Sequence, residues 1–154
     1  MGLKMLESRL CLLLLLGLVL TLASGQRPTP SEWFKIQHII RGSRQCNSAM
    51  IAVNRYTGRC KDFNSFLHTS FADAVRVCGN PRTTCRNGLS TNCHDSSSRV
   101  SVTSCKLTTP SQNFRLCRYQ TTGARKFYRV ACTNRTPRDS PTYPVVPVHL
   151  DRVF

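Results

Sequence analysis

The first half of the chain contains the stretch Cys60-Lys61-Asp62-Phe63-Asn64-Ser65-Phe66, in which a lysine follows a cysteine and a polar Asn-Ser pair lies between two phenylalanines. Two other segments each carry a histidine, and they read Trp33-Phe34-Lys35-Ile36-Gln37-His38 and Pro147-Val148-His149-Leu150-Asp151. An imidazole, with an unperturbed pKa of about 6.5, can act as a base or as an acid at mild pH. These three segments are therefore the candidate carriers of the chemistry.

Length and composition describe a small basic domain. The 154 residues include 22 Lys and Arg against 7 Asp and Glu, a formal charge of +15, and 40% of them are hydrophobic. This apolar fraction is too high for an intrinsically disordered basic tail, and the length fits one domain with a short additional segment. Nine cysteines would be unusual in a cytosolic protein but are common in secreted domains, whose small cores need covalent support.

The N-terminus predicts a signal peptide over residues 1–25. Two basic residues flank the start of an apolar core at residues 10–22, and the small residues Ala23-Ser24-Gly25 follow. A membrane-spanning helix needs roughly 20 apolar residues, more than this core provides. Cleavage after Gly25 leaves a secreted domain of residues 26–154, which keeps 20 of the Lys and Arg residues and 6 of the Asp and Glu residues.

The cysteine count indicates disulfides rather than a metal site. Removal of Cys11 with the signal peptide leaves eight cysteines, enough for four bridges. No pair has the C-x₂-C spacing of zinc sites, and an exported protein would oxidise such thiols. Counting alone allows 105 pairings, so the pattern does not choose among them.

Hydrophobic spacing predicts three short helices in the first half of the mature chain. The first follows Pro30 with Ser31 as its N-cap, the second covers residues 47–56, and the third covers residues 70–77 with Ser70 as its cap and Asp73 in the capping-box position.

The second half has the alternation of β-strands. It predicts a strand over residues 99–107, a hairpin made by residues 114–120 and 125–133 around Thr122-Gly123, and a last strand over residues 145–151 that Pro147 interrupts. Helices followed by strands indicate an α+β domain.

The three segments together resemble the pancreatic ribonuclease (ribonuclease A) superfamily. The central one is similar to the family's C-K-x-x-N-T-F signature, with Ser65 in place of threonine, and the other two match the surroundings of its two catalytic histidines. The resemblance covers residues 31–151, and the signal segment, Trp33 and the tail from Asp139 are most similar to the eosinophil-associated ribonucleases. It implies three short helices packed on a V-shaped antiparallel sheet with four disulfides. The implied pairs are Cys46–Cys105, Cys60–Cys117, Cys78–Cys132 and Cys85–Cys93.

The resemblance also implies a role for each catalytic motif. His38 is expected as the base and His149 as the acid of the first step, and Lys61 as the cation that stabilises the charge of the transition state. Gln37 is expected to donate a hydrogen bond to the phosphate. Asp151, two residues beyond His149 on one strand face, is expected to orient the His149 ring.

Base recognition is expected near the centre of the signature. The hydroxyl of Ser65, with Asn64 beside it, would read a pyrimidine edge, and Asn92 would contact the base on the 3′ side. Leu150 is a further candidate for substrate binding, although an apolar strand residue is more often part of the core. His68 and His94 lie in no motif and are expected to be ordinary surface or core residues.

The implied function is a secreted endoribonuclease that cleaves single-stranded RNA on the 3′ side of pyrimidines through a 2′,3′-cyclic phosphate, with no metal and no cofactor. The 16 arginines and 4 lysines of residues 26–154 would bind RNA phosphates, and also anionic membranes, lipopolysaccharide or heparan sulfate in host defence. The alternative is a cationic defence or chemoattractant polypeptide that depends little on catalysis.

Further expectations concern partners and modification. We expect a monomer that is secreted to the extracellular space, with storage in leukocyte granules as an alternative, and the resemblance implies the cytosolic ribonuclease inhibitor as a partner. Asn134-Arg135-Thr136 is a glycosylation sequon, and Pro137 follows it directly.

Overall fold

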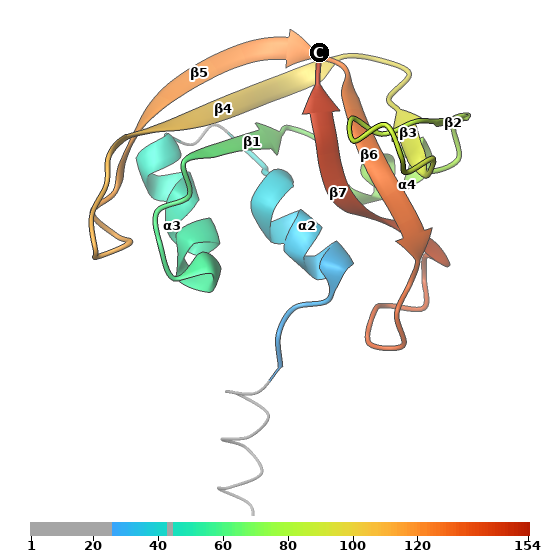
Figure 1. The fold of residues 1–154 in the computed structure, drawn as a ribbon, viewed down its shortest axis with the longest axis horizontal. Coiled ribbons are helices and arrows are strands. Elements are labelled where there is room, and N and C mark those ends of the chain that lie inside the picture. The colour runs from blue at the N-terminus through green and yellow to red at the C-terminus, as the bar shows by residue number, and fades with distance from the viewer. Residues whose placement is uncertain (1–25, 43–44) are drawn as a thin grey trace, which may run out of the picture.

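A computed structural model describes residues 26–42 and 45–154, so the predicted signal peptide lies outside the described residues. The fold is α+β: two antiparallel sheets form the arms of a V, and helices pack on their inner sides (Figure 1). Helix α2 lies between the arms, against β7 and β1. No helix among the described residues is long and apolar enough to cross a membrane.

Helix α2 (Pro30–His38) begins one residue earlier than its predicted cap. Thr29 is the N-cap, and it forms a capping box with Glu32. The prediction of Ser31 as the cap is wrong because Pro30 occupies the first helical position, where its missing N–H costs nothing. The Ser31 hydroxyl instead donates to Asp139 at 2.8 Å.

The other two helices lie close to their predicted positions. Helix α3 (Cys46–Thr57) ends at Gly58, which adopts a left-handed conformation with φ of 71°. Helix α4 (Phe71–Val77) is capped by Ser70, whose side chain accepts a hydrogen bond from the Asp73 N–H at 3.0 Å.

Seven strands make up the two arms. The first sheet has the order β1-β4-β5, with β1 (Phe63–Leu67), β4 (Val100–Thr109) and β5 (Arg118–Lys126). The second has the order β2-β3-β6-β7, with β2 (Arg82–Thr83), β3 (Cys93–Asp95), β6 (Tyr128–Asn134) and β7 (Val145–Val153).

The predicted hairpin around Thr122-Gly123 is wrong. Strand β5 continues through these residues, and Gly123 pairs with Thr103 of β4. The chain passes from one sheet to the other at Phe127, after which β6 pairs with β3 and β7. A Thr-Gly pair between two β-like runs favours a turn locally, but the long partner strand β4 keeps the backbone extended.

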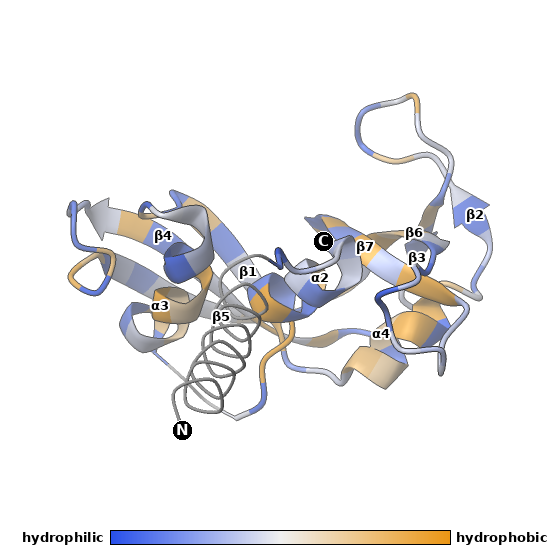
Figure 2. Cartoon of the chain, turned by 90° about the horizontal axis from the view of Figure 1, so that it is seen from below, coloured by the Kyte–Doolittle hydropathy of each residue, from blue (hydrophilic) through white to orange (hydrophobic). Residues whose placement is uncertain are grey.

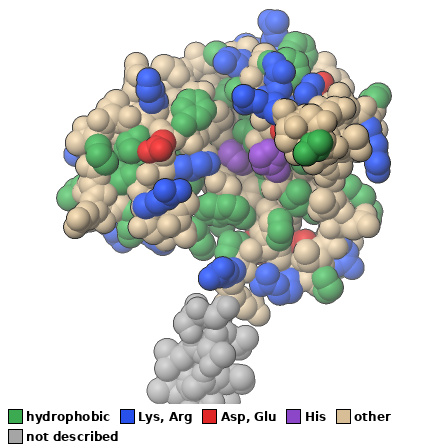
Figure 3. Space-filling view, in the orientation of Figure 1, with side chains coloured by type: hydrophobic (Ala, Val, Ile, Leu, Met, Phe, Trp, Pro, Cys, Tyr) green, Lys and Arg blue, Asp and Glu red, His purple; other side chains and the backbone are tan. Residues whose placement is uncertain are grey.

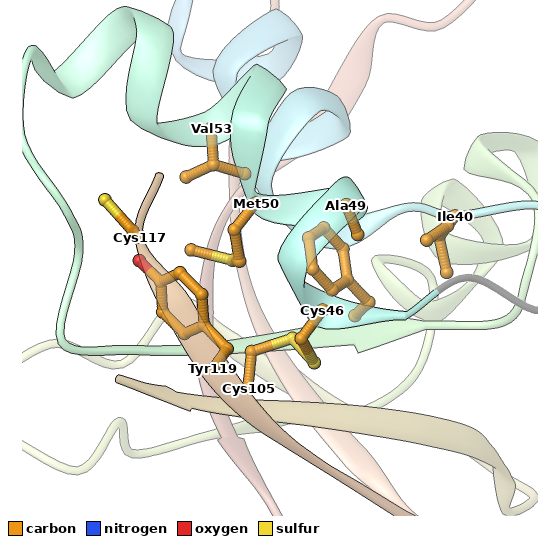
Figure 4. Packing of buried hydrophobic residues seen from close by; sticks show 9 residues of the cluster. Ile40, Cys46, Ala49, Met50, Val53, Cys105, Cys117 and Tyr119 are labelled. Carbon is orange, nitrogen blue, oxygen red and sulfur yellow. A yellow bond between two sulfur atoms is a disulfide. The ribbon is translucent and has the colours of Figure 1, made fainter. Parts of the chain in front are cut away.

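Two hydrophobic cores stabilise the two arms separately. Figure 4 shows Met50 and Val53 of α3 packed toward Tyr119 and the Cys46–Cys105 bridge. In the other arm, Phe34 of α2 packs with residues of α4 and β6, and Figure 2 shows α4 as largely hydrophobic. Helix α2 therefore contributes to the second core while its end reaches the first sheet.

Four disulfides cross-link the described part of the chain, and three of them join segments that are distant in sequence. The bridges have the pairing that the resemblance implies: Cys46–Cys105, Cys60–Cys117, Cys78–Cys132 and Cys85–Cys93. Three of them close loops of more than 50 residues, and the fourth closes a local loop next to β7. Long loops gain most from cross-linking in the chain-entropy account.

Candidate active site

A pocket of about 370 Å³ lies where α2, β1 and β7 meet. In Figure 3 histidine side chains lie in the hollow between the two arms, with lysines and arginines around them. Eight of the nine residues predicted to act on substrate line this pocket: Gln37, His38, Lys61, Asn64, Ser65, His149, Leu150 and Asp151. Segments more than 100 residues apart in sequence thus form a single site.

His38 occupies the last turn of α2; the residue is 9% exposed, and its ring packs against Phe34. Its Nδ1 lies 2.8 Å from the carbonyl oxygen of Ser65. Because a carbonyl can only accept, Nδ1 carries the proton and Nε2 has the free lone pair of a base. Burial lowers the pKa of His38 to about 4. The hydrogen bond to Ser65 acts in the opposite direction, and the positive charges of Lys61 and His149 lower the pKa further. The ring is therefore neutral at physiological pH.

Lys61 is fixed by side chains of α2 and β1. Its Nζ donates to the Gln37 side-chain oxygen and to the Asn64 side-chain oxygen, both at 2.9 Å. The Asn64 amide nitrogen donates in turn to the Gln37 carbonyl at 2.8 Å. Burial lowers the pKa of Lys61. Both polar atoms of Asn64 are thus engaged within the protein, whereas the Gln37 amide nitrogen has no intramolecular partner among the described residues.

Two buried residues that the sequence analysis did not single out hold the Lys61 backbone. The Lys61 N–H donates to the Asn54 side chain at 2.9 Å, and the Lys61 carbonyl accepts from the Tyr119 hydroxyl at 2.7 Å. Asn54 donates to that same hydroxyl at 2.9 Å, which closes the network. Since Asn54 is on α3 and Tyr119 on β5, only the folded topology brings them to Lys61.

His149 and Asp151 form the opposite wall on β7. The side chain of His149 is 62% exposed, and its Nε2 lies 3.4 Å from Asp151 Oδ1. The other oxygen of Asp151 accepts a hydrogen bond from the backbone N–H of Arg86 at 2.9 Å. The β6–β7 register shifts on both sides of His149, leaving Val148 and Asp151 unpaired, and such irregularities re-aim side chains. With Nε2 directed at the carboxylate, Nδ1 is the nitrogen that can face a substrate.

Ser65 and Leu150 also line the pocket. Ser65 is 6% exposed, and Leu150 both lines the pocket and packs against the second core. Residues that the sequence analysis did not assign to the site also line it, namely Phe63, Arg86, Arg152 and Val153. Phe63 lies within the Cys60–Phe66 stretch quoted above. Its place beside the candidate residues Lys61 and Asn64 was the signal in the sequence that could have assigned it to the site.

Asn92 lies outside the pocket lining. Its amide nitrogen donates to the Cys132 carbonyl at 3.0 Å, so the side chain is part of the support for β6. His68 and His94 also have local partners: His68 Nε2 lies 2.7 Å from the Thr103 hydroxyl, and His94 Nδ1 lies 2.7 Å from the Asn80 carbonyl.

One group of metal-ligand types occurs among the described residues, formed by Cys85, Cys93 and Asp151. The two sulfurs are joined in a disulfide, so neither is a thiolate ligand. The carboxylate is engaged with His149 and Arg86. These residues do not fit a metal centre.

The pocket has the components of metal-free acid–base catalysis at a phosphate. It combines a buried neutral imidazole, a second imidazole beside a carboxylate, and an ammonium held by the Gln37 and Asn64 side chains. These groups can remove a proton, supply a proton and stabilise negative charge.

Comparisons with known proteins agree with this geometry. Ribonuclease 2B of Mus musculus is 70% identical, the eosinophil cationic protein of Rattus norvegicus 66% and the non-secretory ribonuclease of Mus musculus 61%, each over the full length of both chains. Residues 29–151 match the pancreatic ribonuclease family. The chain therefore belongs to the pancreatic ribonuclease family.

Proposed function

We propose that the protein is a secreted endoribonuclease that cleaves single-stranded RNA on the 3′ side of pyrimidines without a metal or other cofactor. The observation that carries this proposal is that a buried neutral His38, an exposed His149 and Lys61 line a single pocket. RNA supplies its own nucleophile, the 2′-hydroxyl next to the phosphorus. The protein then needs only a base, an acid and a cation.

In the first step, His38 Nε2 removes the proton of the 2′-hydroxyl, and the oxygen attacks the adjacent phosphorus. The bond from phosphorus to the 5′ oxygen breaks, and His149 Nδ1 gives its proton to that oxygen. The products are a 2′,3′-cyclic phosphate and a free 5′-hydroxyl. The Ser65 carbonyl keeps the His38 tautomer correct, and Asp151 steadies the protonated His149.

In the second step, the two histidines exchange roles. His149 removes a proton from water, the water oxygen attacks the cyclic phosphate, and His38 protonates the departing 2′ oxygen. The product is a 3′-phosphate, and both histidines return to their starting protonation states, so the cycle balances.

Lys61 stabilises the charge that grows on the phosphoryl oxygens in both steps. Its contacts with Gln37 and Asn64 hold the ammonium in place before substrate binds, so little reorganisation is needed during the reaction. Because both polar atoms of Asn64 are already engaged, Asn64 acts as a positioning residue, and the Gln37 amide nitrogen is free to donate to the phosphate.

Ser65 supports the preference for pyrimidines. Its hydroxyl makes no intramolecular hydrogen bond among the described residues, and the residue lines the same pocket as His38 and Leu150. A hydroxyl can donate to one pyrimidine and accept from the other. The role of Asn92 at the base on the 3′ side stays a proposal, and it requires the Asn92 amide to leave the Cys132 carbonyl.

The test is digestion of single-stranded RNA by protein treated with a chelator, beside DNA of the same sequence. RNA cut after pyrimidines, cyclic phosphate products and intact DNA support the proposal, since DNA lacks the 2′-hydroxyl. Loss of RNA cleavage on chelation, or efficient DNA cleavage, would contradict it.

A host-defence role is a second proposed function, and the formal charge of +15 favours it. Exposed arginines can bind anionic membranes, lipopolysaccharide or heparan sulfate. A polypeptide acting only through charge would keep its antimicrobial or chemotactic effect after its ribonuclease activity is removed. Comparison of bacterial killing by the wild-type protein and a His38→Ala variant separates this alternative from a defence role that needs catalysis.

The remaining proposals concern where the protein acts. Cleavage of a signal peptide after Gly25 would accompany export of the protein, and leukocyte granules are one proposed destination. The protein is proposed to be a monomer. The cytosolic ribonuclease inhibitor is its proposed protein partner. Asn134 is exposed at the end of β6, so a glycan there would not obstruct the pocket. Mass spectrometry of protein secreted by mammalian cells tests both the cleavage site and the glycan.

A further inference from the structure

Two arginines and two phenylalanines form a stacked surface where β5 and β7 end. Figure 1 shows the ends of these two strands next to the C-terminus. Reciprocal backbone hydrogen bonds of 2.8 and 2.9 Å join Phe127 and Phe154, and their rings stack at 5.8 Å. The Arg99 guanidinium lies 5.2 Å from the Phe127 ring centroid, and that of Arg152 lies 4.6 Å from the Phe154 centroid. These four residues are called the Arg–Phe stack below.

The guanidinium groups of Arg99 and Arg152 are free to bind a ligand. Both residues are exposed, and across residues 26–42 and 45–154 the ion pairs involve other groups. Arg129 is the instructive contrast, because it also approaches Phe154, at 5.8 Å. Its guanidinium is bound bidentately by Asp95 at 2.7 and 3.2 Å and reaches the Thr84 carbonyl at 3.1 Å. Arg129 is therefore structural, whereas the charges of the stack are uncompensated.

Stacking orients these free charges. A guanidinium above an aromatic ring keeps its in-plane N–H groups available, and that fork matches two oxygens of a phosphate. The Arg125 side chain donates to the Arg99 carbonyl at 3.1 Å, which fixes the Arg99 backbone and brings a third cation nearby. The Arg–Phe stack thus has the chemistry of a phosphate-binding surface.

The stack is continuous with the active site. Arg152 belongs to the stack and also lines the pocket, as does its neighbour Val153. An RNA strand that leaves the pocket past Arg152 meets the phenylalanine pair and then Arg99. This continuity favours the phosphates of the bound RNA as the ligand over an unrelated polyanion.

We propose that the Arg–Phe stack binds backbone phosphates of the RNA strand beyond the phosphodiester that is cleaved. This inference rests on the proposed ribonuclease function and adds a site that holds longer substrates. A dinucleotide is too short to reach Arg99, so the contribution of Arg99 should grow with the length of the RNA.

The test compares Arg99→Gln with Arg115→Gln. Arg115 is a matched control because it is also exposed and stacked on a phenylalanine, Phe114, at 5.7 Å, but it precedes β5 at the opposite end of that strand. The Arg99→Gln substitution should raise KM for a long oligouridylate roughly three- to tenfold at low salt and reduce the salt slope of binding by about 0.7. Arg115→Gln should change neither value by more than about a quarter of these effects.

Cleavage of a uridine-containing dinucleotide separates failure of this inference from failure of the proposed function. The dinucleotide kcat/KM should be the same for the wild type and Arg99→Gln. If the wild type does not cut the dinucleotide, the ribonuclease proposal fails. If it does, and Arg99→Gln leaves the KM of the long RNA unchanged, the stack does not bind RNA.

Two further measurements sharpen the result. Phe127→Leu keeps every charge but removes the ring beneath Arg99, so it should raise the long-RNA KM in the same direction. Retention on immobilised heparin tests the competing ligand. If Arg99→Gln is retained more weakly than the wild type but has an unchanged KM for the long RNA, the stack binds sulfated glycans and the proposal is wrong.

Discussion

His38 Nδ1 donates a hydrogen bond of 2.8 Å to the carbonyl of Ser65. Strand β1 therefore fixes the tautomer of the proposed base through the backbone of the residue proposed to read the pyrimidine. A shift of β1 would disturb both the removal of the 2′-hydroxyl proton by His38 and the recognition of the pyrimidine, because both functions depend on Ser65. This coupling explains why the Asn-Ser-Phe part of the signature and a histidine on a distant helix act as one unit.

The low pKa of His38 predicts an unusually acidic limb in the pH profile. The base is active when neutral, so activity falls as pH drops through its pKa, which burial lowers to about 4. In the profile of kcat/KM, which reports the free enzyme, the acid limb should therefore lie well below 6.5, the ordinary histidine value. Dinucleotide cleavage measured across this range provides the check, and a limb at the ordinary value would contradict the burial argument.

The Tyr119 hydroxyl is predicted to support catalysis without touching substrate. Tyr119→Phe removes the donor to the Lys61 carbonyl and the acceptor for Asn54, which loosens Lys61. We expect kcat to fall about tenfold with little change in KM and the free energy of unfolding to fall by about 1–3 kcal/mol. Tyr128→Phe is the control, because Tyr128 is also buried but packs in the second core. Equal kcat losses in both variants would show a general effect of stability instead.

The sequence predicts the residues of the site far better than it predicts what holds them. His38, Lys61 and His149 are recognisable because each lies in a short contiguous motif. Asn54 and Tyr119 are not, because they reach Lys61 only after α3 packs on β5.

The two errors in the fold have different causes. Local alternation does not distinguish a long strand through Gly123 from a hairpin, since the difference is the long-range pairing with β4. The cap of α2 is set locally, by the capping box of Thr29 and Glu32 with Pro30 at the first helical position. This local signal was present in the sequence, and the prediction of Ser31 missed it.

Asp139 is predicted to stabilise the protein in a pH-dependent way. Burial raises its pKa, but hydrogen bonds from Thr29, Thr136 and Ser31 outweigh that effect and lower the pKa to about 2. A carboxylate with a depressed native pKa stabilises the fold above its unfolded value of about 3.9, and that stability is lost as pH falls through the native value. Asp139→Ala should cost about 1–3 kcal/mol at neutral pH and progressively less between about pH 4 and pH 2.

Urea unfolding of the wild type and Asp139→Ala at a series of pH values measures this difference. Asp139→Asn is a second comparison: it removes the charge and keeps one acceptor oxygen, which can serve the Thr29 and Ser31 hydroxyls, but its amide nitrogen cannot accept from the Thr136 N–H. A cost of Asp139→Ala that stays constant down to pH 2 would mean that the carboxylate charge does not contribute.

Catalysis and surface charge should be separable. Lys61→Ala should lower dinucleotide kcat/KM by about 10²–10³, while RNA binding changes its salt slope by only about one unit. Neutralising Arg118 and Arg125 together should weaken binding to RNA and to anionic vesicles, while dinucleotide kcat/KM stays close to that of the wild type. Arg129 is left out because Asp95 already compensates its charge. If Lys61→Ala lost vesicle binding in step with turnover, the surface-charge explanation of membrane activity would be wrong.

The central claim is that His38 and His149 form an acid–base pair, and release of the 2′,3′-cyclic phosphate from a uridine-containing dinucleotide tests it most directly. The wild type should produce the cyclic phosphate in the presence of a chelator. His38→Ala and His149→Ala should each lower kcat/KM by about 10²–10⁴, whereas His68→Ala, which removes a histidine bonded to Thr103 outside the pocket, should stay close to the wild type. Near wild-type kcat/KM in His38→Ala or in His149→Ala would contradict the mechanism.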